Sequence, residues 1–304
     1  MHTADKDATD YFRGVMATDE RSERVLQLTE HIIRMNPAHY TIWFVYGRAL
    51  IIRILTVAVR QYRYDTLIAL GAPLEKELEL MDEIAKKFIK YYQTWHHRRL
   101  LQTKLCKPLP ELTFIAKILA IDEKNYHTWA YRQWLVVHFN QPELWDGELP
   151  FVELLLSADV RNNSAWHHRF FVVFETGVHA GSLESDECGG KDEALRRELR
   201  FVKEKISLAP NNVSAWNYLR GVCEKSKITL GELKEFVEPY TVPHEKEAGL
   251  DGEDYVDLEN PKPSKNAKLP CALAVEFLAD IYVEEGEKAQ AVEVSCFHQN
   301  ALRF

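Results

Sequence analysis

The chain has 304 residues, of which 46% are hydrophobic and 28% charged, an ordinary composition for a globular protein with a sizeable core. Its formal net charge of −8 argues against a general nucleic-acid-binding protein, although a local basic pocket is compatible with it. The five cysteines are scattered and form no C-x-x-C pair, which excludes a disulfide framework and a cysteine zinc site and favours a reducing compartment, the cytoplasm.

Residues Met1 to Asp10 are polar and lack the apolar segment of a signal peptide, and we expect a flexible N-terminus over residues 1–20. Repeated helical patterns then extend over residues 21–293. The apolar run Ala49–Val59 is too short to span a bilayer and contains Arg53. No membrane span is therefore predicted.

Five segments centred on tryptophan recur along the chain, and each follows an amphipathic stretch with apolar residues at helical spacing. Their tryptophans are Trp43, Trp95, Trp129, Trp166 and Trp216. The middle three segments share the pattern W-x-x-R, whereas the fifth has Leu219 at the arginine position. The repeat unit is therefore a helix A, a short turn and a helix B.

Asparagine is a good N-cap, so Asn125, Asn162 and Asn211 are expected to open B helices. Tryptophan and arginine three residues apart share a helix face, where the tryptophan would fill the space between layers. The arginine would stack on it or bridge to the next repeat. Units of about 35 residues predict an all-α fold, a right-handed α–α superhelix of helix-pair, tetratricopeptide-like repeats.

The spacing of the tryptophans is irregular at two places. The middle three are 34 and 37 residues apart, whereas the intervals before and after them are 52 and 50. Removing the 17 residues Phe44–Arg60 would join Trp43 to the sequence before Arg63, and would restore both W-x-x-R and a spacing of 35. We hypothesise that 44–60 is an atypical insertion, with translated intron sequence and an elongated helix as the two explanations.

The second long interval contains residues 177–191, which are rich in glycine, serine and acidic residues and predict an exposed loop between repeats. A last repeat begins near Pro270, and its second helix near Lys288, but no final tryptophan follows. We treat residues 294–304 as an atypical tail, for which a truncated or misread end is one hypothesis.

No nucleophile elbow, Walker loop, dinucleotide fingerprint or metal-spaced His/Cys set occurs. The pairs His96-His97 and His167-His168 point about 100° apart on a helix, so we expect structural or hydrogen-bonding roles and no metal site. Lys124 and Arg161 precede predicted B-helix entrances, where a cation and a helix N-terminus together bind phosphate. A solvated surface cation is the alternative.

Three strings carry a family resemblance: YQTWHHRR from Tyr92, KNYHTWAYRQW from Lys124 and DVRNNSAW from Asp159, with NNVSAWNYLR from Asn211 similar to a further repeat. They resemble the α-subunit repeats of protein farnesyltransferase and geranylgeranyltransferase type I, over roughly residues 20 to 290 apart from the insertion. The α subunit of the Rab-type enzyme shares N-x-x-W-x-x-R, but these strings look less like it.

The resemblance implies a crescent-shaped α subunit that wraps around a β subunit and acts only as a heterodimer with it. The β subunit would hold the catalytic Zn²⁺ and most of the isoprenoid pocket, and Mg²⁺ would accompany the diphosphate. The cysteine thiolate of a protein ending in C-a-a-X would attack farnesyl or geranylgeranyl diphosphate. The β subunit would decide which isoprenoid is used.

The resemblance also assigns residues. Lys124 matches the lysine that reaches the diphosphate, and we expect it to act in catalysis by stabilising charge on the leaving group. Tyr126 and His127 match positions at the peptide end of the site, and Tyr92 matches a wall residue near the exit of the peptide groove. Spacing and resemblance together assign the organisation of the repeats to Trp95, Arg98, Trp129, Arg132, Asn162, Trp166, Arg169 and Trp216.

Two other functions fit the repeat pattern. The first is the α subunit of Rab geranylgeranyltransferase, which belongs to the same class but serves other substrates. The second is a non-catalytic, tetratricopeptide-like scaffold, in which Lys124 would be an ordinary surface lysine.

Overall fold

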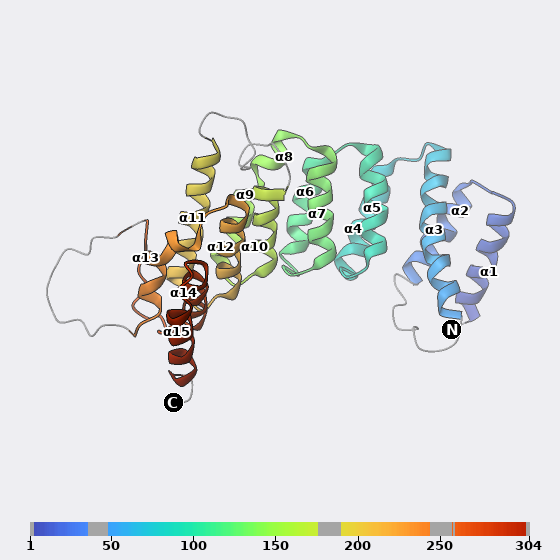
Figure 1. Ribbon diagram of the computed structural model, residues 1–304. Coiled ribbons are helices and arrows are strands. Elements are labelled where there is room, and N and C mark those ends of the chain that lie inside the picture. Colours follow the sequence, from blue (N-terminus) through green and yellow to red (C-terminus); the bar gives the residue numbers. More distant parts are fainter. Residues whose placement is uncertain (1–2, 36–47, 176–189, 244–256, 258, 302–304) are drawn as a thin grey trace. The chain divides into compact units, whose positions relative to one another are not determined.

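A computed structural model describes the backbone of residues 3–35, 48–175, 190–243, 257 and 259–301, and the side chains of residues 7–35, 59–175, 193–243, 257 and 259–294. Over these residues the regular structure is helical, without a strand (Figure 1). The chain divides into two compact units, Met1–Asn140 and Gln141–Phe304, each with its own buried apolar cluster. The predicted all-α fold of helix-pair repeats is confirmed.

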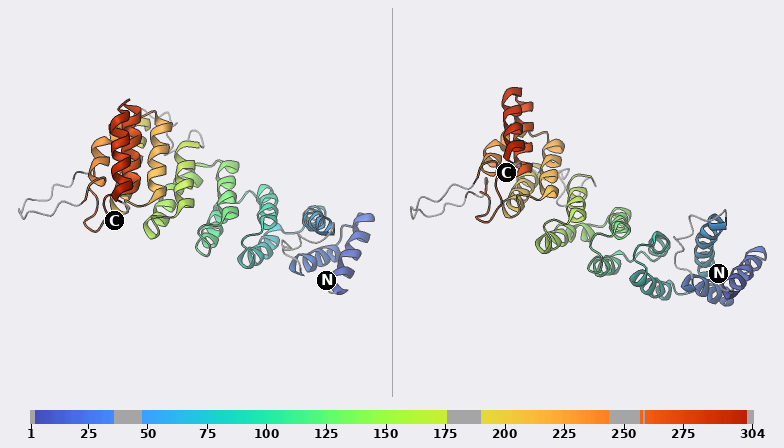
Figure 2. Two further views of the ribbon diagram at one scale, coloured as in Figure 1. Left: turned by 60° about the horizontal axis from the view of Figure 1, so that its bottom comes forward. Right: turned by 90° about the horizontal axis from the view of Figure 1, so that it is seen from below.

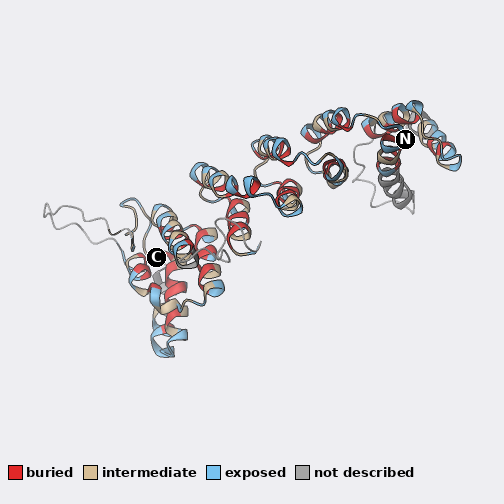
Figure 3. Cartoon of the chain, turned by 90° about the horizontal axis from the view of Figure 1, so that it is seen from above, coloured by how far each residue is buried: buried red, intermediate tan, exposed pale blue. Residues whose placement is uncertain are grey.

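Helices of unit 1 pack as consecutive hairpins, in which α4 pairs with α5 and α6 with α7. The described helices of this unit are α1 (Thr3–Ala17), α2 (Glu23–Met35), α3 (Arg48–Leu70), α4 (Leu74–Lys87), α5 (Tyr92–Leu105), α6 (Pro108–Leu119) and α7 (Tyr126–Phe139). The B helices also contact one another across repeats, α3 with α5 and α5 with α7. Each helix turns a buried face toward its neighbours and an exposed face outward (Figure 3).

Helix α1 corrects the expectation of a flexible N-terminus over residues 1–20. Phe12 and Val15 on one face of α1 are buried, and the Phe12 ring meets the ring of Tyr62 in α3 edge-on at 5.6 Å. The Tyr62 hydroxyl donates hydrogen bonds to the carbonyl oxygens of Val15 and Glu20. A short apolar face on a mostly polar helix is enough for docking when its partner surface is already apolar.

Helix α3 passes without interruption from residue 48, inside the hypothesised insertion, to Leu70 in the first repeat. Residues 36–47, which include Trp43, and the side chains of residues 48–58 lie outside the described residues. Val59 and Arg60, the last two residues of the hypothesised insertion, are buried. The elongated-helix explanation therefore describes the backbone of residues 48–60.

Unit 2 continues the hairpins, with α9 packed against α10 and α11 against α12. Its described helices are α8 (Pro142–Asp146), α9 (Glu148–Ala158), α10 (Asn163–Phe170), which continues as a π-helix (Phe171–Glu175), α11 (Gly190–Leu208), α12 (Val213–Ser226), a 3₁₀-helix (Leu230–Leu233), α13 (Lys234–Val237), a second 3₁₀-helix (Glu238–Tyr240), α14 (Ala272–Glu284) and α15 (Lys288–Ala301). Of the predicted loop 177–191, residues 177–189 lie outside the described residues, and Gly190 and Lys191 begin α11.

The last hairpin begins close to the positions predicted for it, since α14 starts at Ala272 and α15 at Lys288. The two helices lie side by side in both views of Figure 2. Residues 294–301 of the predicted atypical tail have a helical backbone, as the continuation of α15.

The turn between helices A and B is fastened in the same way in four repeats. Each tryptophan indole N–H donates to the carbonyl oxygen six residues earlier, at 2.7 to 3.1 Å. The donors are Trp95, Trp129, Trp166 and Trp216. The indole therefore ties the B helix to the turn that precedes it, and the tryptophan spacing is a repeat signal for this reason.

The asparagine four residues before the tryptophan caps the B helix. Asn125 and Asn162 accept from backbone N–H groups of the first turn, as predicted. The prediction of Asn211 is wrong by one residue: Asn212 caps α12, and Asn211 is exposed and donates to the carbonyl oxygen of Lys268. The repeats of Trp166 and Trp216 each carry two adjacent asparagines, and in both the cap is the one four residues before the tryptophan, Asn162 and Asn212.

Candidate functional site

Three buried glutamates on A helices join successive repeats, and we call Glu77, Glu111 and Glu198 the bridging glutamates. Each accepts a hydrogen bond from the residue two positions after the tryptophan of its own repeat, 20 residues later in the chain. Each also accepts the guanidinium of the preceding repeat's W-x-x-R arginine. One carboxylate thus links a helix of one repeat to a helix of the next.

The junction at Glu77 lies in unit 1. Its carboxylate receives Nε and Nη2 of Arg63 at 2.8 and 2.6 Å, and lies 3.0 Å from Nε2 of His97. This geometry supports the assignment of Arg63 as the arginine of the first repeat, which follows from the removal of residues 44–60. All three side chains are at least 95% buried.

Two further junctions, at Glu111 and Glu198, repeat that geometry with tyrosine in place of histidine. Arg98 donates hydrogen bonds from Nε and Nη2 to the Glu111 carboxylate at 2.6 and 2.8 Å, and the Tyr131 hydroxyl donates to Glu111 at 2.8 Å. In unit 2, Arg169 grips Glu198 at 2.7 and 3.0 Å, and the Tyr218 hydroxyl donates to it at 2.7 Å. The arginines therefore bridge to the next repeat and do not stack on the tryptophans.

Arginine stacking does occur, but on phenylalanine of the following A helix. The guanidinium carbon of Arg98 lies 3.8 Å from the ring centre of Phe114, and that of Arg169 lies 3.6 Å from the ring centre of Phe201. Such cation–π contacts hold the planar guanidinium group in position to bind the carboxylate. The repeat-organising arginines therefore contact both charge and ring.

The two histidine pairs separate as predicted. His97 and His168 are buried against glutamates, Glu77 and Glu148, while His96 and His167 point outward and are exposed. Among the described residues, no group of three or more histidine, cysteine, aspartate or glutamate side chains is placed to hold a metal ion. No described helix is long and apolar enough to cross a membrane.

Burial and partners shift the ionisation of the junctions in opposite directions. Burial opposes the charge on Glu77, but the hydrogen bonds from His97 and Arg63 outweigh it and lower the pKa of Glu77. Burial lowers the pKa of His97, so its imidazole is neutral at pH 7. Burial raises the pKa of Tyr218 well above its usual range, so the phenol keeps its proton. Hydrogen bonds and charge from Arg169 likewise lower the pKa of Glu198 against its burial, so the junctions at Glu77 and Glu198 are ionised carboxylates, each held by an arginine and a neutral donor.

The predicted substrate-site residues lie at equivalent places in two neighbouring repeats of unit 1. Tyr92 is the first residue of α5 and Tyr126 is the first residue of α7. Lys124 lies in the turn before α7, exposed, and His127 follows Tyr126, half-buried. All four residues therefore belong to the entrances of the B helices α5 and α7.

These two helices run parallel, which brings their entrances to the same end. The ring of Trp95 in α5 lies 5.2 Å from that of Tyr131 in α7. One turn further along both helices, the guanidinium of Arg99 lies 5.3 Å from the ring centre of Trp134. Tyr92, one turn before Trp95, is therefore on the same side as the start of α7.

The turn that carries Lys124 is held on both sides. The Trp129 indole donates to the carbonyl oxygen of Glu123 at 2.8 Å, and the Asn125 side chain bonds both Asp122 and the N–H of Thr128. Lys124 stands between these anchored residues, next to the positive end of the α7 dipole. The repeat therefore fixes the backbone at Lys124, from which the side chain extends.

Tyr126 and His127 differ in their surroundings. Tyr126 is 77% exposed, which is unusual for a tyrosine without a partner surface, and its ring lies 5.6 Å from that of His127. Partial burial lowers the pKa of His127, so its ring is neutral at pH 7 and has both a donor and an acceptor nitrogen. The pair can contact a ligand through an aromatic face and a hydrogen-bonding ring.

The sequence analysis missed two lysines near this end, Lys87 and Lys90. Lys90 precedes Trp95 by five residues, as Lys124 precedes Trp129, and this shared offset was a usable signal. With Lys87, Tyr91 and Asp122 it lines a cavity of about 320 Å³ beside the turn of Lys124. Lys90 adds positive charge to the B-helix entrances of unit 1.

Comparison with known proteins assigns the repeats to a family. Residues 74–105, 109–139, 145–176 and 195–226 match the family model described as protein prenyltransferase alpha subunit repeat. The chain is 32% identical over 281 residues to the protein farnesyltransferase/geranylgeranyltransferase type-1 subunit alpha of Candida albicans, covering 90% of this chain and 76% of that subunit. It therefore belongs to the protein prenyltransferase α-subunit family.

Other relatives refine the place within the family. The subunit of the same name from Schizosaccharomyces pombe is 42% identical over 232 residues, covering 71% of this chain and 63% of that subunit. The solved structure of Candida albicans protein geranylgeranyltransferase-I complexed with GGPP matches with a TM-score of 0.71 at 29% identity, covering 97% of this chain and 85% of that one. The geranylgeranyl transferase type-2 subunit alpha of Bos taurus is 30% identical over 203 residues, only 34% of its length.

Proposed function

We propose that this chain is the α subunit of a heterodimeric protein prenyltransferase of the farnesyltransferase/geranylgeranyltransferase type I kind. Paired with a β subunit, it transfers farnesyl or geranylgeranyl from the diphosphate to the cysteine of a C-terminal C-a-a-X sequence. The observation that carries the proposal is the grouping of Tyr92, Lys124, Tyr126 and His127 at the parallel entrances of α5 and α7, in a chain whose relatives carry that name. The cytoplasm remains the proposed compartment.

In this proposal Lys124 acts on the leaving group. As the carbon–oxygen bond to the isoprenoid breaks, negative charge grows on the diphosphate, and an ammonium group at the positive end of a helix stabilises it. The stabilisation increases as the bond breaks, so the chemical step gains more from it than ground-state binding does. Tyr126 and His127 hold the peptide end, and His127 offers a ring N–H to the substrate carboxylate.

The described part of this chain offers no metal-binding cluster, so we assign the zinc ion to the β subunit. A zinc ion bound there would supply the positive charge that keeps the substrate thiol ionised at neutral pH. Mg²⁺ would accompany the diphosphate as a second positive charge. The contribution of this chain is limited to positioning the peptide and neutralising the leaving group.

The test is co-expression with a farnesyltransferase β subunit, and separately with a type I geranylgeranyltransferase β subunit, followed by prenylation of a C-a-a-X peptide. Lys124→Ala should lower the single-turnover rate by about 10²-fold or more, with isoprenoid affinity nearly unchanged. Lys117→Ala is the matched control, because Lys117 is an exposed lysine on the A helix of the same repeat.

The outcomes separate the candidate functions. Unchanged single-turnover kinetics in Lys124→Ala would remove Lys124 from the mechanism. Activity only with a Rab-type β subunit and a Rab escort protein would identify the type-2 function instead. Failure to bind any of the three β subunits would leave a non-catalytic repeat scaffold.

A further inference from the structure

Helix α3 has the register of a B helix, but Arg60 stands where the other repeats have a tryptophan. Arg63 holds Glu77 as the W-x-x-R arginines of the later repeats hold their glutamates. The tryptophan position lies three residues before that arginine, and in α3 this residue is Arg60. Arg60 is 3% exposed, within the range of 2–6% for the four described tryptophans.

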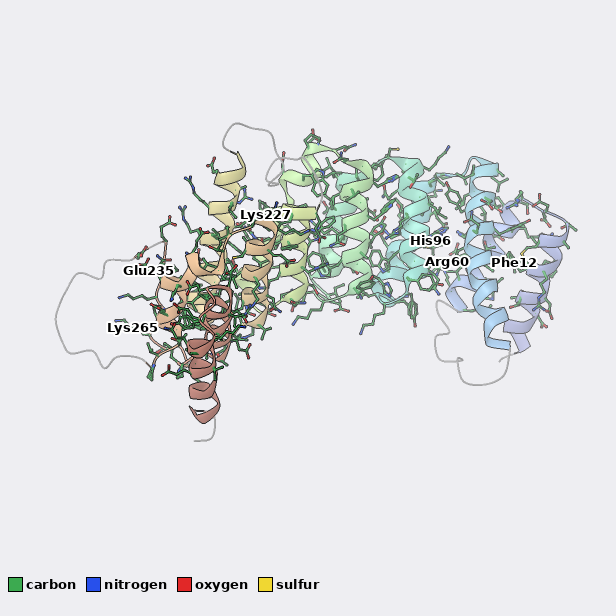
Figure 4. All side chains as sticks on the ribbon, in the orientation of Figure 1. Phe12, Arg60, His96, Lys227, Glu235 and Lys265 are labelled. Carbon is green, nitrogen blue, oxygen red and sulfur yellow. The ribbon has the colours of Figure 1, made fainter. Side chains whose placement is uncertain are left out.

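The neighbours of Arg60 on α5 are also those of a repeat tryptophan. Arg60 and the residue after it line a cavity of about 200 Å³ with three residues of α5. In unit 2, Trp166 and the residue after it line a cavity of about 240 Å³ with the residues at the same three positions of α12. The matching residues are Gln93, His96 and His97 of α5 and Ser214, Asn217 and Tyr218 of α12. Figure 4 labels Arg60 and His96 on the facing helices α3 and α5.

Arginine is a poor substitute for tryptophan at this position. Nη1 of Arg60 lies 3.6 Å from the sulfur of Met81, whereas Nε and Nη2 are buried and make no hydrogen bond with a described residue. Burial lowers the pKa of Arg60 to about 10, so the guanidinium is still charged at pH 7. Glu77 offsets this charge only in part, since it also pairs with Arg63 at 2.6 Å. The buried charge and the unused donors both oppose folding.

Helix α3 also begins at a different place from the later B helices. The helices α5, α7, α10 and α12 each begin three residues before their tryptophan, whereas α3 begins at Arg48, twelve residues before Arg60. The nine additional residues extend α3 by about 13 Å past the level at which α5 begins, as Figure 1 shows. Because α3 packs against α5, this extension borders the substrate end of unit 1, the end that carries Tyr92 and Lys124.

Without residues 44–60 the sequence has the parts of a complete first repeat. Helix α2 ends at Met35, and removal of the segment would leave the four residues Asn36–His39 between it and Tyr40. The turns before α5, α10 and α12 also have four residues. Tyr40 stands three residues before Trp43, the offset at which a tyrosine begins both α5 and α7.

We infer that residues 44–60 form an autoinhibitory insertion, which places Arg60 in the tryptophan position of the first repeat and extends α3 beside the substrate end. The chain without the insertion folds more stably, because it has no buried charge in that position. It also pairs more tightly with a β subunit, because the extension no longer borders the end where partner and substrate meet. The first consequence concerns this chain alone, and the second rests on the proposed function.

Three variants of the full chain separate the two consequences. Deletion of residues 44–60 removes both the buried charge and the extension. Arg60→Met removes only the buried charge, since methionine is apolar and leaves the length of α3 unchanged. Arg24→Met is the control, because Arg24 is exposed and pairs with Glu20 on the surface of the same unit.

Thermal unfolding of the chain alone measures the first consequence. The midpoint should rise by about 3 °C or more in Arg60→Met and further in the deletion variant, and should stay within about 1 °C of wild type in Arg24→Met. The inference is overturned if the deletion lowers the midpoint, or if Arg60→Met leaves it unchanged.

Titration of each variant with a farnesyltransferase β subunit measures the second consequence. The deletion variant should bind about tenfold or more tightly than wild type, whereas Arg60→Met, which keeps the extension, should bind nearly as wild type does. Equal affinities of wild type and the deletion variant would overturn the autoinhibitory role. If no form of the chain binds any of the three β subunits, the proposed function fails, while a raised midpoint in Arg60→Met still supports the place of Arg60 in the tryptophan position.

Discussion

The junctions at Glu77 in unit 1 and at Glu198 in unit 2 use one design with different charge balance. In both, an arginine of the preceding repeat holds a buried carboxylate, and a neutral donor 20 residues after the carboxylate completes the contact. At Glu198 the remaining guanidinium nitrogen of Arg169 pairs with Glu153 at the surface. At Glu77 a second buried arginine, Arg60, adds positive charge, and its Nε and Nη2 make no hydrogen bond.

The difference shows which parts of a junction the repeat imposes. The bidentate arginine–glutamate pair recurs because each repeat places the same two helices side by side, and a buried carboxylate without its arginine would be strongly destabilising. Arg60 lies outside this pattern, three residues before Arg63, on the stretch that breaks the tryptophan spacing.

The largest effect on stability is predicted for substitution of the bridging glutamates. Glu77→Gln and Glu198→Gln should each lower the free energy of unfolding by about 3–5 kcal/mol, because a buried guanidinium loses its charge partner. Glu77→Gln should cost more, since the charge of Glu77 offsets the buried charges of both Arg63 and Arg60. Urea denaturation of the full chain measures the difference.

A second substitution sharpens that result. Adding Arg60→Met to Glu77→Gln should recover part of the lost stability, whereas adding Arg24→Met should recover none. Equal losses for Glu77→Gln and Glu198→Gln, with no recovery, would mean that Arg60 does not interact with the junction.

Removal of a neutral donor is predicted to have the next largest effect on stability. Tyr218→Phe removes the hydroxyl that donates to Glu198 at 2.7 Å, and should cost about 1.5–3 kcal/mol, the usual range for a hydrogen bond to a charged group. Tyr131→Phe, at Glu111, should cost a similar amount. A loss below 0.5 kcal/mol in both, on the scale of a neutral surface substitution, would show that arginine alone satisfies the carboxylate.

Histidine and tyrosine donors should respond differently to pH. The pKa of His97 is lowered by folding, so the unfolded chain binds the proton more readily and stability falls as pH drops below about 6.5. The pKa of Tyr218 is raised, so stability falls only as pH rises above about 10.

His97→Gln keeps a donor for Glu77 but removes the titration. Between pH 6 and 5 it should reduce the slope of unfolding free energy against pH, by at most about 1.4 kcal/mol per pH unit, the limit for one proton, while Tyr218→Phe leaves that slope unchanged. An identical slope in wild type and His97→Gln would show that His97 does not titrate on unfolding in this range.

The smallest effect compares two adjacent asparagines. Asn212→Ala removes the α12 cap and should cost about 1 kcal/mol, whereas Asn211→Ala should cost a few tenths. Thermal unfolding of the two variants measures it. The reverse order would restore the assignment of Asn211 as the cap.

The helix-pair repeat was predictable because its signals are local. Tryptophan spacing reports the indole bond to the turn six residues earlier, and asparagine four residues before it reports the cap. The pattern restored at Arg63 correctly identified an arginine that donates to a carboxylate, Glu77, on the next A helix. Lys124, Tyr126 and His127 were found through resemblance, and their repeat positions agree with a shared surface.

By itself, therefore, the sequence determined the fold class and the repeat boundaries from Trp95 onward, since these depend on spacing along one or two helices. Only the tertiary structure decided that residues 3–17 dock as a helix, that Asn212 caps α12, and that glutamates join the repeats. It alone showed that Arg60 is buried with its Nε and Nη2 outside any hydrogen bond. Burial and charge pairing between separate helices are sums over the whole neighbourhood, and no local pattern of residues specifies them.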